Sequence, residues 1–361
     1  MLIPNIVVRW NYLPYTIMNG VVTMSKHLLG YTPSRPDYRD FVYGALKSVD
    51  PTNLPAQFDL GYLPVNTQVY GNCVGQSSRV IKYFQEKKDY PKAGFDFSPD
   101  FIYNECKIRD GKPAEEGTEP RIAMKVLSSV GAALKADFPV LAKHDISVKA
   151  NENVYTKALT YRVKSYARLQ TIAEVKAAIY NDGPVMLAGL VTEGFRDTKD
   201  GFIDYPNGDF LGGHAYTAVG YDDNLTHKYP DGRTEKGFVI IQNSWGEKWG
   251  IKGRAYIPYS MFGYRLDIGI PFFDEMWASV DLTLGGADIP PDVVEDDNTE
   301  TITMWVGKSV AFVNGKQVTL TQPPIINNGS TLAPVRFVAE TAGYTLSYNA
   351  SEKRIDMKRN K

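Results

Sequence analysis

The sequence predicts an α+β protein with a helical lobe, a β-barrel-like lobe and a cleft between them, followed by a small α+β domain. Apolar residues at helical spacing dominate the first half of residues 31–280, and strand-like runs dominate from Pro184 onward. An acidic stretch at 281–300 then interrupts the pattern. A helical half followed by a β half packs as two lobes, and 361 residues are enough for two or three domains.

The expected helices are marked by their apolar spacing and by signals at their ends. Apolar residues fall on one helical face over 77–84 and again over 122–130. Thr171 and Glu174 form a capping box for a third helix, and the Asn-Asp-Gly-Pro sequence at 181–184 ends it. These segments predict the helical lobe and one helix that packs against the sheet.

The expected strands are short apolar runs bounded by turn residues. They lie at 185–191, 214–219, 238–242 and 254–257. In the last part of the chain, short strands surround Asn314-Gly315 and Asn328-Gly329, and one helix is expected over 334–341. An Asn-Gly pair between two apolar runs is a strong signal for a hairpin.

Composition and charge divide the chain into four segments. Residues 1–30 carry basic residues but no acid, and their broken apolar runs do not fit a signal peptide; we interpret them as an N-terminal arm, a short pro-segment or, upstream of Met24, a translation-start artefact. Residues 31–280 form the main domain. Residues 281–300 hold seven acids and no Lys or Arg, as in a solvated linker. Residues 301–361 form the last domain.

The overall composition is that of an ordinary globular protein and excludes several functional classes. Apolar residues make up 43% and charged residues 22%. The balance of 40 Lys and Arg against 41 Asp and Glu argues against a nucleic-acid-binding surface. With two cysteines and four scattered histidines we expect no metal site and no cofactor. No apolar run reaches the roughly 18 residues that a membrane helix requires.

Cys73 is the first candidate catalytic residue. It follows a glycine-containing loop at 68–72 and precedes the helix expected over 77–84. A thiol at a helix N-terminus feels the positive end of the helix dipole, which lowers its pKa. The alternative is a buried structural cysteine, and Cys106, which has no glycine loop beside it, keeps that interpretation. A Cys73–Cys106 disulfide is a further alternative.

His214 and Asn243 are the second and third candidates. His214 begins a strand after two glycines, and Asn243 ends another strand just before a Trp-Gly pair. Each alone fits a structural histidine or a turn residue. Together with Cys73 they supply what a thiolate nucleophile needs, namely a base and a third group that orients the base. Trp245 would shield the His214–Asn243 hydrogen bond from water and border the substrate site.

These segments resemble the papain-like cysteine peptidases of the papain family. Residues 243–246 are the most specific match, and the resemblance covers about 35–265. Residues 37–40 and 54–60 are similar to the start of the mature domain in bacterial members, and residues 97–103 and 115–118 are similar to the following helix and substrate-side loop. The resemblance implies a papain-like two-lobe fold.

The resemblance also implies an oxyanion hole formed by Gln68 and the Cys73 backbone N–H. Gln68 lies five residues before Cys73, where the family usually has six. Either a glycine turn absorbs the shorter loop, or the carboxamide of Gln68 moves away from the oxyanion. The long inhibitory propeptide of plant and lysosomal members does not fit into about 35 residues, so any latency would come from the N-terminal arm.

Three further residues are implied to contact the substrate. Gly117 would pair with the substrate backbone, and Ala188 and Gly213 would help line the main specificity pocket. Because both pocket residues are small, we expect room for a bulky apolar side chain.

Residues 306–359 resemble the small stalk module named after the copper amine oxidase N-terminal domain. The segments that carry this resemblance are 313–316, 323–326, 331–340 and 344–348. No His or Cys follows Glu300, so a copper site has no plausible ligands there. The resemblance implies a spacer or surface-attachment unit, and a stabilising β appendage without a partner is the alternative.

These observations predict a hydrolase, a cysteine endopeptidase that acts on proteins or peptides. One alternative is a weakly active or inactive papain-like scaffold that binds peptides or a cell surface through its cleft and stalk. Another is a transferase or exopeptidase with the same triad. The stalk resemblance favours an extracellular or surface-associated location, bacterial or phage-related, although no signal peptide is legible.

Overall fold

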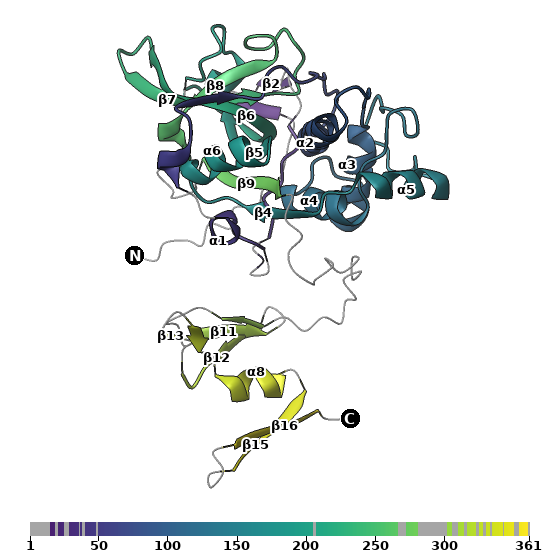
Figure 1. Cartoon of the computed structure of the whole chain (residues 1–361), viewed down its shortest axis with the longest axis vertical. Coiled ribbons are helices and arrows are strands. Elements are labelled where there is room, and N and C mark those ends of the chain that lie inside the picture. Colours follow the sequence, from purple (N-terminus) through teal and green to yellow (C-terminus); the bar gives the residue numbers. More distant parts are fainter. Residues whose placement is uncertain are drawn as a thin grey trace. The chain divides into compact units, whose positions relative to one another are not determined.

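The chain forms two compact units, Met1–Pro291 and Asp292–Lys361, in a computed structural model (Figure 1). The structure describes residues 15–18, 21–24, 29–35, 37, 40–47, 50–204, 207–265, 272–280, 302–304, 310–313, 316–322, 325–327, 330–332, 334–341, 343–349 and 354–359. The linker predicted at 281–300 lies outside the described residues, and so do the Asn-Gly pairs at 314–315 and 328–329.

The helices of the first unit confirm the three segments predicted from apolar spacing. The α-helices are α1 (Tyr43–Leu46), α2 (Cys73–Asp89), α3 (Pro99–Arg109), α4 (Pro120–Ser129), α5 (Glu152–Ala158), α6 (Ile172–Asn181) and α7 (Glu193–Arg196). Short 3-10 turns occur at Pro51–Asn53, Leu159–Tyr161 and Tyr259–Gly263. The capping box of Thr171 and Glu174 is present at the start of α6, and Ser98 caps α3 by accepting the Phe101 N–H at 3.1 Å.

A seven-stranded antiparallel sheet forms the other half of this unit. Its strands are β3 (Gln57–Asp59), β4 (Ser165–Arg168), β5 (Val185–Thr192), β6 (Phe210–Lys228), β7 (Thr234–Gln242), β8 (Arg254–Pro258) and β9 (Phe273–Val280). They pair in the order β4-β9-β5-β6-β7-β8, with β3 on β6. The strands predicted between 185 and 257 are confirmed, whereas β3, β4 and β9 were not predicted. A separate hairpin pairs β1 (Tyr15–Met18) with β2 (Val21–Met24).

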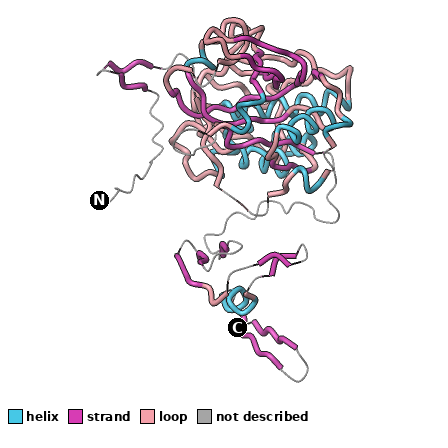
Figure 2. The backbone as a smooth tube through the Cα atoms, turned by 90° about the vertical axis from the view of Figure 1, so that its left-hand side faces the viewer, coloured by secondary structure: helices cyan, strands magenta, loops and turns pink. Residues whose placement is uncertain are grey.

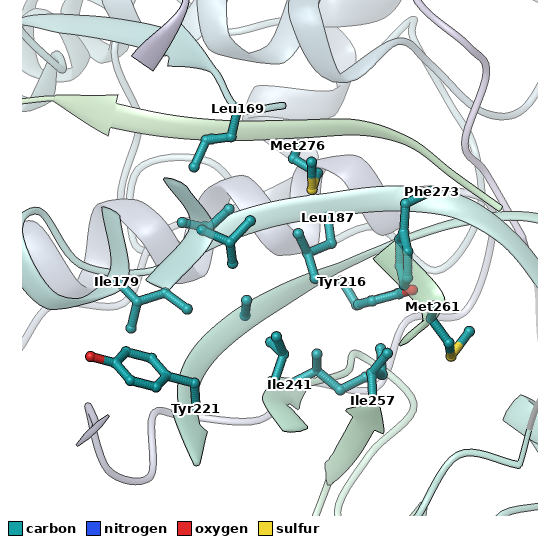
Figure 3. Packing of buried hydrophobic residues seen from close by; sticks show 14 of the residues in the cluster. Leu169, Ile179, Leu187, Tyr216, Tyr221, Ile241, Ile257, Met261, Phe273 and Met276 are labelled. Carbon is teal, nitrogen blue, oxygen red and sulfur yellow. The ribbon is translucent and has the colours of Figure 1, made fainter. Parts of the chain in front are cut away.

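The sheet separates two hydrophobic cores because successive side chains of a strand point to opposite faces. In β5, where all eight residues are buried, Val185 and Leu187 belong to one core, and Met186 and Ala188 belong to the other. Figure 3 shows the first core, in which side chains of β5 to β9 meet those of α6. The second core lies among α2, α3 and α4, and Figure 2 shows these helices gathered beside the strands.

The second unit is built from short antiparallel pairs and one helix. Its elements are β10 (Ile302–Met304), β11 (Val310–Val313), β12 (Lys316–Thr319), β13 (Ile325–Asn327), β14 (Ser330–Leu332), α8 (Val335–Thr341), β15 (Tyr344–Asn349) and β16 (Arg354–Arg359). Val313 pairs with Lys316, which confirms the hairpin predicted there. The expected helix over 334–341 corresponds to α8.

Candidate active site

Cys73 is the first residue of α2, and its side chain is fully buried. Side chains of the helical lobe hold the loop in front of it. The Gly71 N–H donates to Glu116 Oε2 at 2.7 Å, and Asn72 Nδ2 donates to Asp100 Oδ1 at 2.7 Å. The sulfur therefore lies at the N-terminus of a long helix, behind a loop that is held from two sides.

His214 and Asn243 lie next to each other on neighbouring strands. His214 belongs to β6 and Asn243 follows β7, close to the point where Thr217 pairs with Gln242. His214 Nε2 lies 2.8 Å from Asn243 Oδ1, which also accepts the Ser244 N–H at 2.8 Å. Because an amide oxygen only accepts hydrogen bonds, Nε2 is the protonated nitrogen in this contact.

Aromatic rings cover the His214–Asn243 hydrogen bond. Trp245 stacks on the His214 ring, with centroids 4.6 Å apart and 22° between the planes. Phe195 contacts Trp245 edge-on, with centroids 5.5 Å apart, and Trp249 Nε1 donates to the Phe195 carbonyl at 3.3 Å. Excluding water lowers the local dielectric constant, which strengthens the hydrogen bond.

The strand that carries His214 also reaches Cys73. The Ala215 N–H hydrogen-bonds to the Cys73 thiol. One turn further along α2, Ser77 Oγ lies 2.8 Å from Thr217 Oγ1. Helix α2 is thus attached to β6 beside the histidine, and the structure brings the predicted nucleophile and the His–Asn pair to one place.

Gln68 is attached to the loop that follows β7. Its N–H donates to the Ser244 carbonyl at 2.8 Å, and its Oε1 accepts the Ser244 hydroxyl at 2.5 Å. Its Nε2 donates to the Tyr70 carbonyl at 3.1 Å. That same carbonyl accepts the Asn72 N–H at 2.7 Å, and this tight turn gives a physical reason for the short spacing before Cys73.

Residues 29–35 cover Cys73. They overlap the end of the N-terminal arm predicted at 1–30, and from here on 'the arm' means residues 29–35. The Gly30 N–H hydrogen-bonds to the Cys73 thiol. A Cβ atom at Gly30 would overlap the carbonyl oxygen of Gly71, so the two backbones are in direct contact. Only glycine permits such a close approach. The arm therefore occupies the space that a substrate would need to reach the sulfur.

Backbone hydrogen bonds hold the arm on both sides. On the helical side, the Thr118 N–H donates to the Gly30 carbonyl at 3.0 Å, and the Thr32 N–H donates to the Thr118 carbonyl at 3.0 Å. On the sheet side, the Tyr31 N–H donates to the Gly213 carbonyl at 3.2 Å. The arm thus lies between the two lobes, beside the strand end that carries His214.

Burial raises the pKa of the Cys73 thiol to about 12, although hydrogen bonds from Ala215 and Gly30 act in the opposite direction. This differs from the lowered pKa that its place at a helix N-terminus predicts. Removal from water disfavours the charged thiolate, and this effect is larger than that of the hydrogen bonds that reach the sulfur. Because the arm helps to exclude water, the covered form holds Cys73 as a neutral thiol.

Gly117 lies beside the arm, but its own polar groups are taken by the helical lobe. Its N–H donates to the Tyr103 hydroxyl oxygen at 2.9 Å, and its carbonyl accepts Lys107 Nζ at 2.8 Å. Its φ of +90° favours glycine. The backbone pairing expected at Gly117 is made by its neighbour Thr118, which bonds to Gly30.

Ala188 and Gly213 lie where the Tyr31 side chain is bound. Ala188 on β5 lies opposite Ala215 on β6, and both share a hydrophobic cluster with Tyr31. On the other side of Ala188 lies Glu275 of β9, whose Oε1 accepts the Tyr31 hydroxyl at 3.3 Å. The predicted specificity pocket thus ends at a carboxyl group.

Glu275 was not found from the sequence, and neither was the backbone pairing of Thr118 with Gly30 and Thr32, although residues 115–118 were expected in the substrate-side loop and any latency was expected from the N-terminal arm. Glu275 lies in a run at 273–280 for which no strand was predicted. The sequence signal for its role was an acid in an otherwise apolar run, between Phe273 and Met276. A carboxyl group on a buried strand needs hydrogen-bond partners, so such an acid indicates a polar site within the core.

Both cysteines are free thiols, so the alternative of a Cys73–Cys106 disulfide is wrong. Cys106 is buried in the core of the helical lobe, and burial raises the pKa of its thiol well above the usual value. In the described part of the chain, no three His, Cys, Asp or Glu side chains are grouped to hold a metal ion. Among the described helices, none combines the length and apolar character needed to span a membrane.

Two family models match the chain. Residues 95–262 match the papain family cysteine protease model, a range that includes His214 and Asn243 and begins after Cys73. Residues 291–357 match the copper amine oxidase N-terminal domain.

Relatives among known proteins are peptidases of the same kind. An uncharacterized peptidase C1-like protein of Acanthamoeba polyphaga mimivirus is 26% identical over 270 residues, which cover 66% of this chain and 83% of that protein. A gut-specific cysteine proteinase of Caenorhabditis elegans is 35% identical over 101 residues, and these cover only 27% of each protein.

Solved structures show the same fold. Xylellain, a cysteine protease from Xylella fastidiosa, is 25% identical with a TM-score of 0.59, and the match covers 72% of this chain and 99% of that one. A proCathepsin B from Trypanosoma congolense is 18% identical with a TM-score of 0.52, covering 71% of this chain and 87% of that one, and it supports the fold alone. The chain therefore carries a papain family cysteine protease domain, and a copper amine oxidase N-terminal domain follows it.

Proposed function

We propose that the protein is a cysteine endopeptidase in which Cys73 is the nucleophile, His214 is the general acid and base, and Asn243 orients His214. One observation carries the assignment. His214 Nε2 lies 2.8 Å from Asn243 Oδ1, while the next residue of the same strand, Ala215, donates its N–H to the Cys73 thiol. This arrangement supports a nucleophile, a base and an orienting group in one place.

The catalytic roles of Cys73, His214 and Gln68 follow from which of their atoms are already hydrogen-bonded. Asn243 Oδ1 accepts a hydrogen bond from the Nε2–H of His214, so Nδ1 is the nitrogen that exchanges a proton with Cys73. The Cys73 thiolate attacks the peptide carbonyl carbon, and the oxyanion is bound by the Cys73 N–H and Gln68 Nε2. The protonated His214 then gives its proton to the leaving amine. Water, deprotonated by His214, hydrolyses the thioester and restores the thiol.

The proposal includes latency imposed by the arm. The Gly30 N–H donates a hydrogen bond to the Cys73 sulfur. The thiol is neutral in this form because burial raises its pKa to about 12. A substrate reaches Cys73 only after residues 29–35 have moved away. In that open form, water and the protonated His214 stabilise the thiolate, which lowers its pKa.

Stoichiometric labelling with an epoxide or vinyl-sulfone thiol inhibitor separates this function from a papain-like scaffold without catalytic power. With the arm displaced, we expect Cys73 to react at neutral pH much faster than free cysteine, while Cys106 stays unmodified. Mass spectrometry of the two cysteine peptides gives both rates. A Cys73 rate no higher than that of free cysteine would favour the scaffold.

Gln68→Ala should lower kcat by about 100- to 1000-fold and change KM little, because one oxyanion donor acts mainly in the transition state. Gln57→Ala is a suitable control, since Gln57 lies on the exposed start of β3. Steady-state kinetics with one peptide substrate measures both variants. If Gln68→Ala retained most of the activity, the carboxamide would not be part of the oxyanion hole.

For the second unit, Asp292–Lys361, we keep the two interpretations that its sequence predicts. A spacer or attachment module at the cell surface is one interpretation, and a stabilising appendage is the other. The peptidase domain implies protein or peptide substrates in either case.

A further inference from the structure

We propose that Asp100 is a positioning residue for the reaction, which holds the turn at residues 70–72 and thereby directs the side-chain amide of Gln68 toward the oxyanion. The inference deepens the proposed function and rests on it for the catalytic roles of Cys73 and Gln68. Asp100 acts through its hydrogen bonds to the loop before Cys73 and not on the substrate itself.

The turn before Cys73 closes over three residues. The Asn72 N–H donates to the Tyr70 carbonyl at 2.7 Å, which is the hydrogen-bond pattern of a γ-turn. Asn72 is followed directly by Cys73, whose N–H is one of the two proposed oxyanion donors. Because so short a turn has little support of its own, its geometry depends on the outside groups that hold its two ends.

The same Tyr70 carbonyl sets the orientation of the Gln68 side chain. Gln68 Nε2 donates to this carbonyl at 3.1 Å, and Gln68 Oε1 accepts the Ser244 hydroxyl at 2.5 Å. A carboxamide is planar and carries two N–H donors on its nitrogen, so these two contacts fix the direction of the second Nε2–H. If the Tyr70 carbonyl moves, the second N–H turns with it.

One carboxylate oxygen holds both ends of the turn. Asp100 Oδ1 accepts the Tyr70 hydroxyl, and it also accepts Asn72 Nδ2 at 2.7 Å. The residue between them, Gly71, donates its N–H to Glu116 Oε2 at 2.7 Å. The side chains on either side of Gly71 therefore end at the same atom, so the two ends of the turn cannot separate unless one of these bonds breaks.

Asp100 is itself held in place. It is fully buried in the first turn of α3, where the helix dipole favours a negative charge. Its other oxygen, Oδ2, accepts the Leu141 N–H at 2.9 Å. Burial raises the pKa of Tyr70, and the charge of Asp100 adds to that shift, so the Tyr70 hydroxyl keeps its proton and donates. The carboxylate thus has donors on both oxygens and presents Oδ1 to the turn at a fixed position.

A carboxylate at this place has more to do with geometry than with stability. Apolar residues of the same volume avoid the desolvation penalty of a buried charge. A placement error of about 1 Å, in contrast, can lower the rate of a reaction about 100-fold. Gln68 lies only five residues before Cys73, so the loop between them has little slack to correct such an error. We therefore expect the loss of Asp100 to appear in the rate of hydrolysis.

Hydrolysis of a peptide substrate is the first measurement, in a full-length parent chain that carries Tyr31→Ala. This change removes the buried ring of the arm and adds no atom near Gly71. In this chain, Asp100→Asn should lower kcat about ten- to a hundredfold and change KM by less than about threefold. A carboxamide opposes the donors of the turn, or that of Leu141, with its own N–H. A kcat within about threefold of the parent would overturn the inference.

Glu105→Gln is the matched control. Glu105 lies on the same helix, is 4% exposed and also accepts a tyrosine hydroxyl, that of Tyr155, at 2.6 Å. Its variant loses a buried carboxylate charge whose partners are Tyr155 and Arg109 rather than the turn. We expect its kcat to stay within about threefold of the parent. An equal loss of kcat in both variants would point to the fold of α3 alone and contradict a positioning role.

Labelling of Cys73 by iodoacetamide separates the positioning of the oxyanion donors from a general disturbance of the site. The sulfur displaces iodide from a saturated carbon, so no oxyanion forms in this reaction. Asp100→Asn should therefore be labelled within about threefold of the parent rate, because the thiol and its base keep their places. Labelling that slowed in proportion to hydrolysis would show that Cys73 or His214 has moved, which contradicts an action on the oxyanion donors.

A double variant with Gln68→Ala tests the route of the effect. If Asp100 acts through the Gln68 amide, Asp100→Asn should lower kcat by no more than about threefold in a Gln68→Ala chain, because residues that act as one unit are not additive. A further loss of about tenfold or more in that chain would rule out the route through Gln68.

If Asp100→Asn does not fold, Tyr70→Phe decides, with Tyr155→Phe as its control. Tyr70→Phe removes one of the two bonds between the turn and Asp100 Oδ1 and should lower kcat at least about fivefold, with iodoacetamide labelling unchanged. Tyr155→Phe should change neither rate, and an unchanged kcat in Tyr70→Phe would overturn the inference. A parent chain that is labelled at Cys73 but hydrolyses no peptide would instead contradict the proposed function, and the inference would fall with it.

Discussion

Replacing Cys73 with alanine is expected to lower peptide hydrolysis by at least about 10,000-fold, because the reaction loses its nucleophile and the other thiol, Cys106, is buried in the core of the helical lobe. The measurement uses a chain in which the arm has been displaced, so that the parent activity is high. His214→Ala should cause a loss of similar size. The double variant should be no worse than either single one, since residues that act as one catalytic unit are not additive.

Cys106→Ala is the matched control. Cys106 is also buried and free, so its replacement tests whether the loss of any buried thiol disturbs the fold. We expect this variant to keep nearly full activity and to differ only slightly in thermal stability. Hydrolysis that survived Cys73→Ala would show that another residue carries the reaction.

Gly30→Ala should activate the full-length chain, raising both hydrolysis and the labelling of Cys73 at neutral pH by about ten- to a hundredfold. The added methyl group overlaps the Gly71 carbonyl oxygen, and overpacking of this kind costs about 1 to 3 kcal/mol. The loop of Gly71 is held by Glu116 and Asp100, so the arm is the side that moves. A tenfold change in population corresponds to about 1.4 kcal/mol.

The pKa of Cys73 predicts how the rate of thiol labelling depends on pH in the covered and the open form. In the covered form a pKa of about 12 keeps the thiol neutral at pH 7, so labelling should rise steadily as the pH increases toward that value. Once the arm is displaced, the thiol meets water and His214, its pKa falls, and labelling becomes fast at neutral pH.

Gly94→Ala controls for the change of glycine itself, because a Cβ atom there meets nothing within 4 Å. It should leave both rates unchanged. If Gly30→Ala were labelled faster but hydrolysed no more substrate, the methyl group would have disturbed the loop before Cys73. If neither rate rose, the arm would not be what limits access to the sulfur.

The arm also depends on contacts away from the sulfur. Arg121 Nε donates to Asp40 Oδ1 at 2.7 Å, and a second Arg121 nitrogen contacts Asp37. The Arg121 N–H donates to the Ser34 hydroxyl oxygen at 3.1 Å. These bonds attach the last part of the arm, at Ser34, and the residues after it to the start of α4. Moving residues 29–35 away from Cys73 therefore also breaks the Ser34 contact, while the ion pairs of Asp37 and Asp40 with Arg121 can stay in place.

Periodicity and end signals in the sequence were sufficient to determine the elements that carry the site. The helix that begins at Cys73, the strand that carries His214 and the strand that ends before Asn243 each follow from the local spacing of apolar residues, because such spacing reports which faces are buried. The identity of three chemically compatible residues on these elements, together with the resemblance of the surrounding segments to papain-like peptidases, was enough to predict a peptidase. Their catalytic roles remain a proposal.

Only the tertiary structure decided what lies against Cys73. Gly30 and Tyr31 sit in a segment with no motif and little periodicity, and they meet Gly71, Thr118, Gly213 and Glu275 across long stretches of chain. Local patterns show that a residue is buried but not which distant group covers it. For that reason the raised pKa of Cys73 and the carboxyl group at the end of the Tyr31 site could not be predicted from the sequence.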